Sequence, residues 1–152
     1  MTNNDIIRRL RYAFSLNDDT VIKLFSFADV NVTREQISNW LKKDEDPAFK
    51  AILDIELAAF LNGFIIYKRG AQEGKKPINE KRLNNNLVLR KLKIALNLKD
   101  TDMLDIFDLA DMRLSKSELS AFFRKPTQNQ YKVCKDQFLR NFIHGLQLKY
   151  RK

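Results

Sequence analysis

Apolar and polar residues follow the same pattern twice along this chain. Shifting the numbering by 82 aligns the second half with the first without a gap, from Arg8 and Arg90 to Arg69 and Arg151. A single offset held over that length indicates one structural unit used twice. Other identical pairs are Leu10/Leu92, Phe25/Phe107, Asp54/Asp136, Phe60/Phe142 and Gly63/Gly145.

Each repeat is predicted to form four helices, because its apolar residues recur three and four positions apart. In the first repeat we expect a helix over residues 5–14 and a second after the polar cluster at 17–19. The third opens at Thr33, with a glutamine three positions on, which is the spacing of a capping box. The fourth is predicted from Asp46, an N-cap residue followed by proline, to about Lys68.

The fourth helix is apolar on nearly all sides, and a helix of that kind is buried. We expect it to lie between the repeats, with a dimer interface as the alternative. Gly63 and Gly145 occupy matching interior positions, where glycine is unfavourable unless another helix comes close. The copy of this helix is expected to keep one solvated face. It has Lys135, Gln137, Arg140 and Gln147 where the first has Leu53, Ile55, Ala58 and Ile65.

Composition supports a helical fold. The 152 residues include four glycines and three prolines, too few for the many turns of an all-β protein. We therefore expect an all-α protein of about eight helices, in two similar four-helix repeats packed as one body. The repeats are assigned to residues 1–69 and 87–152, and residues 70–86, which hold half of the glycines, form a connector.

Several stretches resemble one family of bacterial proteins. They are Phe60-Leu61-Asn62-Gly63 running on to Lys68-Arg69-Gly70, then Asn84-Asn85-Asn86 with Val88-Leu89-Arg90-Lys91-Leu92, and Cys134-Lys135-Asp136-Gln137-Phe138-Leu139-Arg140. The family is the YehS-like one, domain of unknown function 1456, and the resemblance covers essentially the whole chain. It implies a small all-helical bacterial protein, and it supplies no activity or catalytic residue.

Candidate catalytic chemistry is sparse. A single histidine and a single cysteine do not support a histidine/cysteine metal site, and no phosphate loop, nucleophile elbow or dinucleotide fingerprint is present. Cys134 aligns with the apolar position Ile52 and is expected to be a small buried side chain. His144 aligns with Asn62 and is expected to be partly exposed. We expect no enzyme activity, no cofactor, no metal and no catalytic residue.

The second and third helices of each repeat resemble a helix-turn-helix. In the first copy, residues 21–41, Val30 and Val32 flank the turn, and Ile37 and Trp40 form the inner face of the second helix. Asn31 stands where glycine is usual, and the second copy matches less well because Arg113 lies in its turn. Any amphipathic hairpin of this size gives a similar pattern, so a purely structural hairpin is the alternative.

Charge favours the second repeat as a nucleic-acid surface. The chain carries a net charge of +9; residues 1–69 are neutral, whereas residues 87–152 hold fourteen basic and seven acidic side chains. A nucleic-acid site needs a local excess of Lys and Arg. The candidate residues lie in the turn before the helix that starts at Ser115 and on one side of that helix; they are Arg113, Lys116, Ser120, Arg124 and Lys125. A solvated helical surface that binds no ligand is the alternative.

The sequence thus favours a non-catalytic binding module, a nucleic-acid-binding regulator that uses the hairpin of its basic second repeat. A protein–protein adaptor that binds no nucleic acid is the alternative. We expect DNA or RNA, or otherwise a protein, as partner, and a monomer or homodimer. No targeting segment is recognised, and the longest uncharged run, residues 57–67, is shorter than the roughly 20 residues of a membrane span. A cytoplasmic location is therefore expected.

Overall fold

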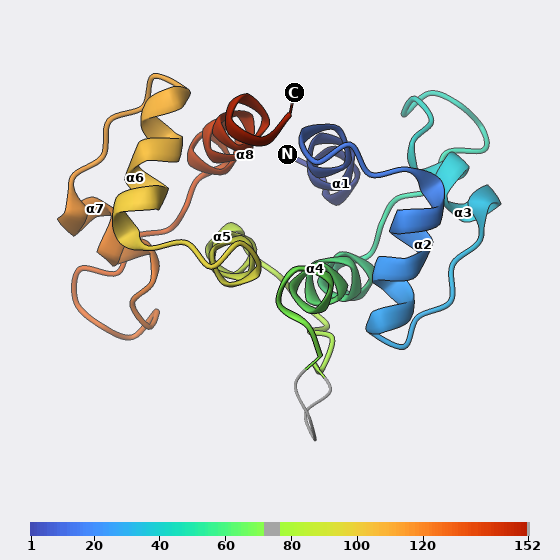
Figure 1. Ribbon diagram of the computed structural model, residues 1–152, viewed down its shortest axis with the longest axis horizontal. Coiled ribbons are helices and arrows are strands. Elements are labelled where there is room, and N and C mark those ends of the chain that lie inside the picture. Colours follow the sequence, from blue (N-terminus) through green and yellow to red (C-terminus); the bar gives the residue numbers. More distant parts are fainter. Residues whose placement is uncertain (72–76, 152) are drawn as a thin grey trace.

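The computed structural model describes residues 1–71 and 77–151, and within them the chain forms eight α-helices and no strand (Figure 1). The first repeat contains α1 (Asn3–Ala13), α2 (Asp18–Phe27), α3 (Arg34–Trp40) and α4 (Asp54–Arg69). The second contains α5 (Asn85–Ala95), α6 (Asp100–Leu109), α7 (Lys116–Phe122) and α8 (Asp136–Tyr150). The predicted all-α fold with two four-helix repeats is confirmed.

Four helices form the centre of the molecule, two from each repeat. Figure 1 looks along α1, α4, α5 and α8, with α2 and α3 on one side and α6 and α7 on the other. Helix α4 packs on α5 of the other repeat, and α1 packs in the equivalent way on α8. Within the repeats, α2 packs on α4 and α6 packs on α8. A pseudo-twofold axis therefore relates the repeats, and every central helix contacts the opposite repeat.

The N-terminal ends of α1, α4 and α5 lie together. Asn3 donates one hydrogen bond to the Ile52 carbonyl at 3.0 Å and another to the Asp54 carboxylate at 2.8 Å. The second oxygen of Asp54 accepts the backbone N–H of Leu83 at 2.9 Å. The hydrogen bonds from the Asn3 side chain and from the Leu83 N–H hold the pKa of Asp54 below its ordinary value.

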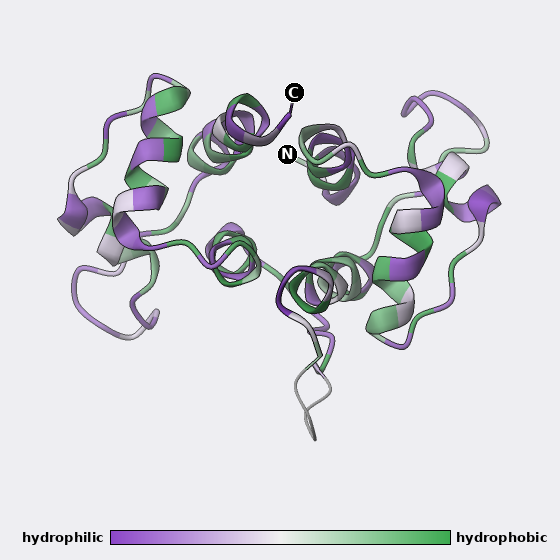
Figure 2. Cartoon of the chain, in the orientation of Figure 1, coloured by the Kyte–Doolittle hydropathy of each residue, from purple (hydrophilic) through white to green (hydrophobic). Residues whose placement is uncertain are grey.

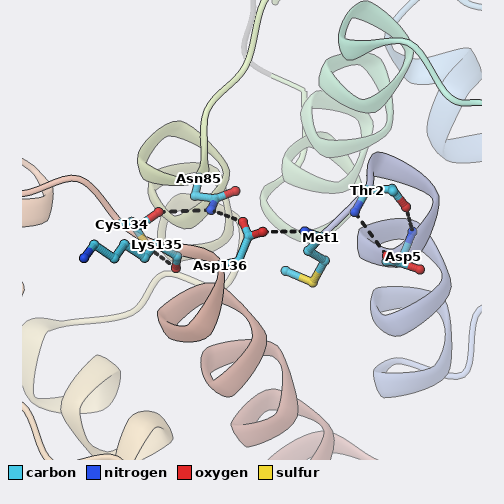
Figure 3. Close-up of polar contacts among 7 residues, drawn as sticks. All are labelled: Met1, Thr2, Asp5, Asn85, Cys134, Lys135 and Asp136. Atoms are coloured by element: carbon cyan, nitrogen blue, oxygen red, sulfur yellow. Dashed lines mark hydrogen bonds and ion pairs between the residues drawn. The ribbon is translucent and has the colours of Figure 1, made fainter.

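The second repeat contains the equivalent set of bonds (Figure 3). Asn85 donates to the Cys134 carbonyl at 3.0 Å and to Asp136 at 2.7 Å. Asp136 also accepts from the N-terminal ammonium of Met1, at the position that corresponds to the N–H of Leu83. The hydrogen bonds from Met1 and Asn85 lower the pKa of Asp136. The starts of α8, α5 and α1 are thereby tied together.

The C-terminal ends of the central helices are also joined in matching ways. Arg151 donates to the Tyr12 carbonyl at 2.7 Å and to the Ser15 hydroxyl at 3.1 Å. Arg69, 82 residues earlier, makes the equivalent two bonds at the end of α5. The four central helices therefore run in the same direction. Cations at their C-terminal ends and carboxylates at their N-terminal ends oppose the aligned helix dipoles.

Helix α4 begins later than the sequence predicts. Asp46 does not start a helix; its side chain accepts the N–H of Ala48 at 2.9 Å and closes a turn. The helix starts at Asp54, after Leu53 as N-cap. The prediction was wrong because the segment before Asp54 is held extended by side chains of α1.

A buried asparagine holds that extended segment. Asn4, 3% exposed, donates to the carbonyls of Trp40 and Lys50 at 2.9 and 2.8 Å and accepts the Ile52 N–H at 2.9 Å. Asn86 makes the same three bonds in the second repeat. One amide in each repeat thus satisfies three backbone groups, of which two are buried and one is partly buried.

Burial of α4 agrees with the prediction over its middle and differs at its start. All eight residues from 57 to 64 are buried. Leu53 and Ile55, expected to be buried, are 62% and 40% exposed; Leu53 is the N-cap of α4, and Ile55 lies in its first turn. Figure 2 shows apolar residues mainly on the sides of helices that face other helices.

The two interior glycines mark close helix contacts, as predicted. A Cβ atom at Gly63 would lie 1.8 Å from the Leu24 carbonyl oxygen of α2, and one at Gly145 would lie 2.1 Å from the Ile106 carbonyl oxygen of α6. No side chain fits at either position without moving backbone. The glycines therefore set how closely α4 and α8 approach the outer helices.

Candidate functional site

The second and third helices of each repeat, which form the predicted hairpins, are α2 with α3 and α6 with α7. Thr33 and Ser115 cap α3 and α7 through the predicted capping boxes. Ile37 and Leu119 are buried on the inner faces of these short helices. The outer faces of α3 and α7 are largely exposed, so they remain accessible to a partner.

The predicted site residues of the second repeat lie in two groups. Lys116 and Ser120 lie on α7, with Lys116 exposed and Ser120 partly buried, and Arg113 precedes the helix with its side chain 94% exposed. The prediction that Arg124 lies on the same side of this helix as Lys116 and Ser120, with Lys125 beside it, was wrong, because α7 ends at Phe122. Arg124 and Lys125 lie instead in the turn that follows, where the Lys125 N–H donates to Gln128.

Arg124 and Lys125 join other cations beside α5. They line a hollow of about 230 Å³ together with Arg90, Asn84 and Tyr131. Arg90 also borders a second hollow of about 370 Å³, which Arg69 and Lys93 line. We call Arg69, Lys93, Arg90, Arg124 and Lys125 the basic strip. Arg69 was not predicted as a site residue, because it belongs to the neutral first repeat. The signal that could have found it is that Arg151 occupies the equivalent position at the offset of 82.

The corresponding surface of the first repeat is partly neutralised by two carboxylates, of which one, Asp18, has an equivalent in the Asp100 that pairs with Lys93 of the basic strip at 2.7 Å. It has a hollow of about 500 Å³ lined by Arg8, Arg11 and Arg151. Asp5 contacts Arg8 at 3.0 Å, and Asp18 contacts Arg11 at 2.6 Å. Burial by itself raises the pKa of Asp5, but hydrogen bonds from Thr2 and the nearby Arg8 and Arg9 lower it overall.

The hairpin of the first repeat is neutralised in the same way. Arg34, the equivalent of Lys116, pairs with Asp18 at 3.7 Å and directly with Asp19. In the second repeat Thr101 replaces Asp19, and Lys116 forms no ion pair with any described residue. Further acidic positions of the first repeat are neutral in the second: Asp5, Asp44, Glu45 and Asp46 correspond to Leu87, Pro126, Thr127 and Gln128.

Other reactive side chains are placed as follows. Cys134 is 1% exposed, as predicted, and burial raises the pKa of its thiol to about 12, so the thiol stays protonated near neutral pH. His144 is exposed on α8. In residues 1–71 and 77–151, no three His, Cys, Asp or Glu side chains are grouped as metal ligands. No helix of that same part of the chain is long and apolar enough to cross a bilayer.

One buried polar cluster was not predicted. Lys91 is 8% exposed, and its ammonium lies 2.7 Å from Glu80 and 2.7 Å from the side-chain oxygen of Asn62. The Asn62 amide in turn donates to Asn79 at 3.1 Å. This cluster fixes residues 77–80 of the connector against α4 and α5. Sequence alone gave no indication, since the partners come from three separate segments.

Comparison with known proteins gives a family and no activity. The family described as "Protein of unknown function (DUF1456)" matches residues 3–70 and again residues 85–152. The chain is 41% identical over 147 residues to the uncharacterized protein YehS of Escherichia coli strain K12, covering 96% of this chain and 94% of that protein. No solved structure matches it significantly. The chain therefore belongs to the DUF1456 family, of which it carries two tandem copies.

Proposed function

We propose that this protein is a non-catalytic binding module that binds nucleic acid through its second repeat. The binding surface would combine the basic strip with Arg113, Lys116 and Ser120 of the hairpin. Lys and Arg side chains there would contact phosphates, which supply most of the sequence-independent affinity for nucleic acids.

One observation carries this proposal: equivalent surfaces of the two repeats differ in their carboxylates. Arg8 and Arg34 have acidic partners at 3.0 Å or closer. Arg90 instead donates to the Phe123 carbonyl at 2.7 Å and forms no ion pair with any residue that the structure describes. The second repeat keeps the Lys93–Asp100 pair at 2.7 Å, and Arg113 lies 3.8 Å from Asp108. It has Leu87 and Thr101 in place of Asp5 and Asp19, however, so its surface carries an excess of cations that suits a polyanion.

Nucleic-acid binding is testable by titration of labelled DNA and RNA at two salt concentrations. A complex with several phosphate contacts loses affinity steeply as salt rises. The triple variant Lys116→Glu, Arg124→Glu, Lys125→Glu should lose most of the binding and reduce the slope of log affinity against log salt by about three. Circular dichroism should show unchanged helix content, because all three side chains are exposed.

The first repeat provides a matched control. Arg34, Lys42 and Lys43 are the equivalents at the offset of 82, and reversing them to glutamate changes the net charge equally. This control should weaken binding less, because Arg34 already has two acidic partners. Equal losses from both variants would contradict the assignment to the second repeat. No binding at low salt would exclude nucleic acid and leave the protein–protein adaptor.

A further inference from the structure

The connector covers only one of two equivalent helix seams. We call the contact between α4 and α5 the α4–α5 seam and the contact between α1 and α8 the α1–α8 seam. Figure 1 shows the described part of the connector beside α4 and α5, whereas on the outer side of α1 and α8 it shows only the end of the chain that follows α8. The connector leads directly into α5, with Leu83 bound to Asp54 at 2.9 Å, so residues 77–80 stay at the α4–α5 seam.

An amide and a carboxylate of the connector are recognised at the α4–α5 seam. Glu80 accepts from Lys91 of α5 at 2.7 Å. Asn79 accepts from Asn62 of α4 at 3.1 Å and donates to the Ala28 carbonyl at the end of α2 at 3.2 Å. A cation from α5, a side-chain donor from α4 and a backbone acceptor at the end of α2 therefore bind the successive residues Asn79 and Glu80.

The pseudo-twofold axis places a similar set of groups at the α1–α8 seam. Arg9, His144 and Ala110 are the equivalents of Lys91, Asn62 and Ala28 at the offset of 82. Arg9 and His144 are exposed and form no hydrogen bond or ion pair with the described residues. Ala110 is partly exposed, whereas Ala28 is 4% exposed. The α1–α8 seam thus retains a cation, a ring nitrogen donor and a backbone acceptor, without a segment over them.

We propose that the α1–α8 seam is a docking site for an extended segment of a partner protein, in which an amide residue is followed by an acidic one. The occupant is defined by the connector, whose Asn79-Glu80 pair fills the equivalent place. Arg9 binds the carboxylate, and its guanidinium can do so with two parallel hydrogen bonds. His144 donates to the amide oxygen, and the Ala110 carbonyl accepts from the amide nitrogen.

The experiment is an NMR titration with a synthetic peptide that has the sequence of residues 77–82. His144 is the only histidine, so its ring signals report directly on the α1–α8 seam. The connector binds in cis with an effective concentration in the millimolar range, so the peptide is titrated to millimolar concentrations. A peptide with lysine in place of the glutamate serves as the control ligand.

The expected result is a saturable shift of the His144 signals by the peptide and none by the control ligand. Arg9→Glu should weaken binding about tenfold or more, as expected for loss of a charge-assisted hydrogen bond. Its fold should be unchanged, because Arg9 is exposed and unpaired among the described residues. No shift, an equal shift with the control ligand, or an unchanged affinity of Arg9→Glu would overturn the proposal.

The result is independent of nucleic-acid binding. Lys116→Glu reverses one charge on α7 and should leave peptide binding unchanged while weakening binding to DNA or RNA. Arg9→Glu should do the opposite. A loss of both activities in both variants would show that charge alone, and not the seam, attracts the peptide, which would also overturn the proposal.

Discussion

At the scale of single residues, two asparagines organise the loops that precede α4 and α8. Asn4 and Asn86 each bind a buried carbonyl, a buried N–H and a second carbonyl that is partly buried. A buried backbone group that loses its partner costs about 1–3 kcal/mol. These two side chains therefore contribute to stability well beyond their own buried area, and they do so at matching places in the two repeats.

Replacement of Asn4 by alanine should lower the free energy of unfolding by about 3 kcal/mol, because three backbone groups lose their partner together. Asn86→Ala should cost a similar amount. Urea denaturation of both variants measures these losses. Asn31→Ala, at an exposed turn position, is the control and should change stability little. A loss below about 1 kcal/mol for both buried asparagines would show that water or a rearranged loop replaces the amide.

The interior glycines give a second residue-scale prediction. Gly63→Ala places a Cβ 1.8 Å from a backbone oxygen of α2, so the helices must move apart. The intrinsic preference of helices for alanine, about 1 kcal/mol, acts in the opposite direction. We expect a net destabilisation of about 2 kcal/mol, in the range of overpacked cores. Thermal unfolding measures it, and a stabilised Gly63→Ala variant would contradict the observed α2–α4 contact.

At the scale of elements, residues 79 and 80 of the connector bind across the α4–α5 seam. Its carboxylate, Glu80, pairs with a lysine that is 8% exposed. Burial acts to raise the pKa of Glu80, but the hydrogen bond and charge of Lys91 outweigh it and lower the pKa below the ordinary value. Lys91 therefore stabilises the charged form of the Glu80 carboxylate, so the contribution of this ion pair to the stability of the protein depends on pH.

The sign of this dependence follows from the lowered pKa. The stabilisation by Glu80 is complete above the pKa of an unfolded glutamate, near 4.5, and is lost as pH falls through the lower folded value. Glu80→Gln should lower stability at pH 7 and show a smaller further loss on acidification than the natural protein. Denaturation midpoints between pH 7 and pH 3 measure both. Parallel pH profiles for the two proteins would contradict a stabilising ion pair between Glu80 and Lys91.

At the scale of the whole molecule, the repeats depend on each other. The principal packing partner of α1 is α8 and that of α5 is α4, while contacts between α1 and α4 are few. Phe14 of the first repeat also packs on Tyr150 of the second at 5.3 Å between ring centroids. A separated repeat would expose to water the faces of its two central helices that pack on the other repeat. Packing of the two repeats against each other buries these faces.

Residues 1–71 expressed alone should therefore not form a cooperatively folded monomer. Two outcomes fit this expectation: loss of helical circular dichroism, or a homodimer in which α1 packs on α4 of the second copy, as the pseudo-twofold axis allows. Sedimentation and thermal melting distinguish them. A monomeric fragment that melts cooperatively would show that each repeat has a sufficient core of its own.

Most of the local structure follows from the sequence. The offset of 82 predicts the repeat, the apolar spacing predicts eight helices, and Thr33 and Ser115 predict their capping boxes, because these features depend on residues a few positions apart. Glycine inside both long helices predicts that another helix packs closely there, but it does not indicate which helix. The burial of Cys134 follows from its match to an apolar position.

Only the tertiary structure decides what depends on residues far apart in the chain. Asp46 and Pro47 have the local preference of a helix start, yet Asn4 holds the next residues extended, 46 or more positions from its own place in the chain. Arg124 and Lys125 join Arg90 and not the face of α7, because α7 ends at Phe122. Contacts between the repeats decide the parallel arrangement of the four central helices. They also create the two seams, of which the connector covers one. Local patterns of polarity do not encode such contacts between distant segments.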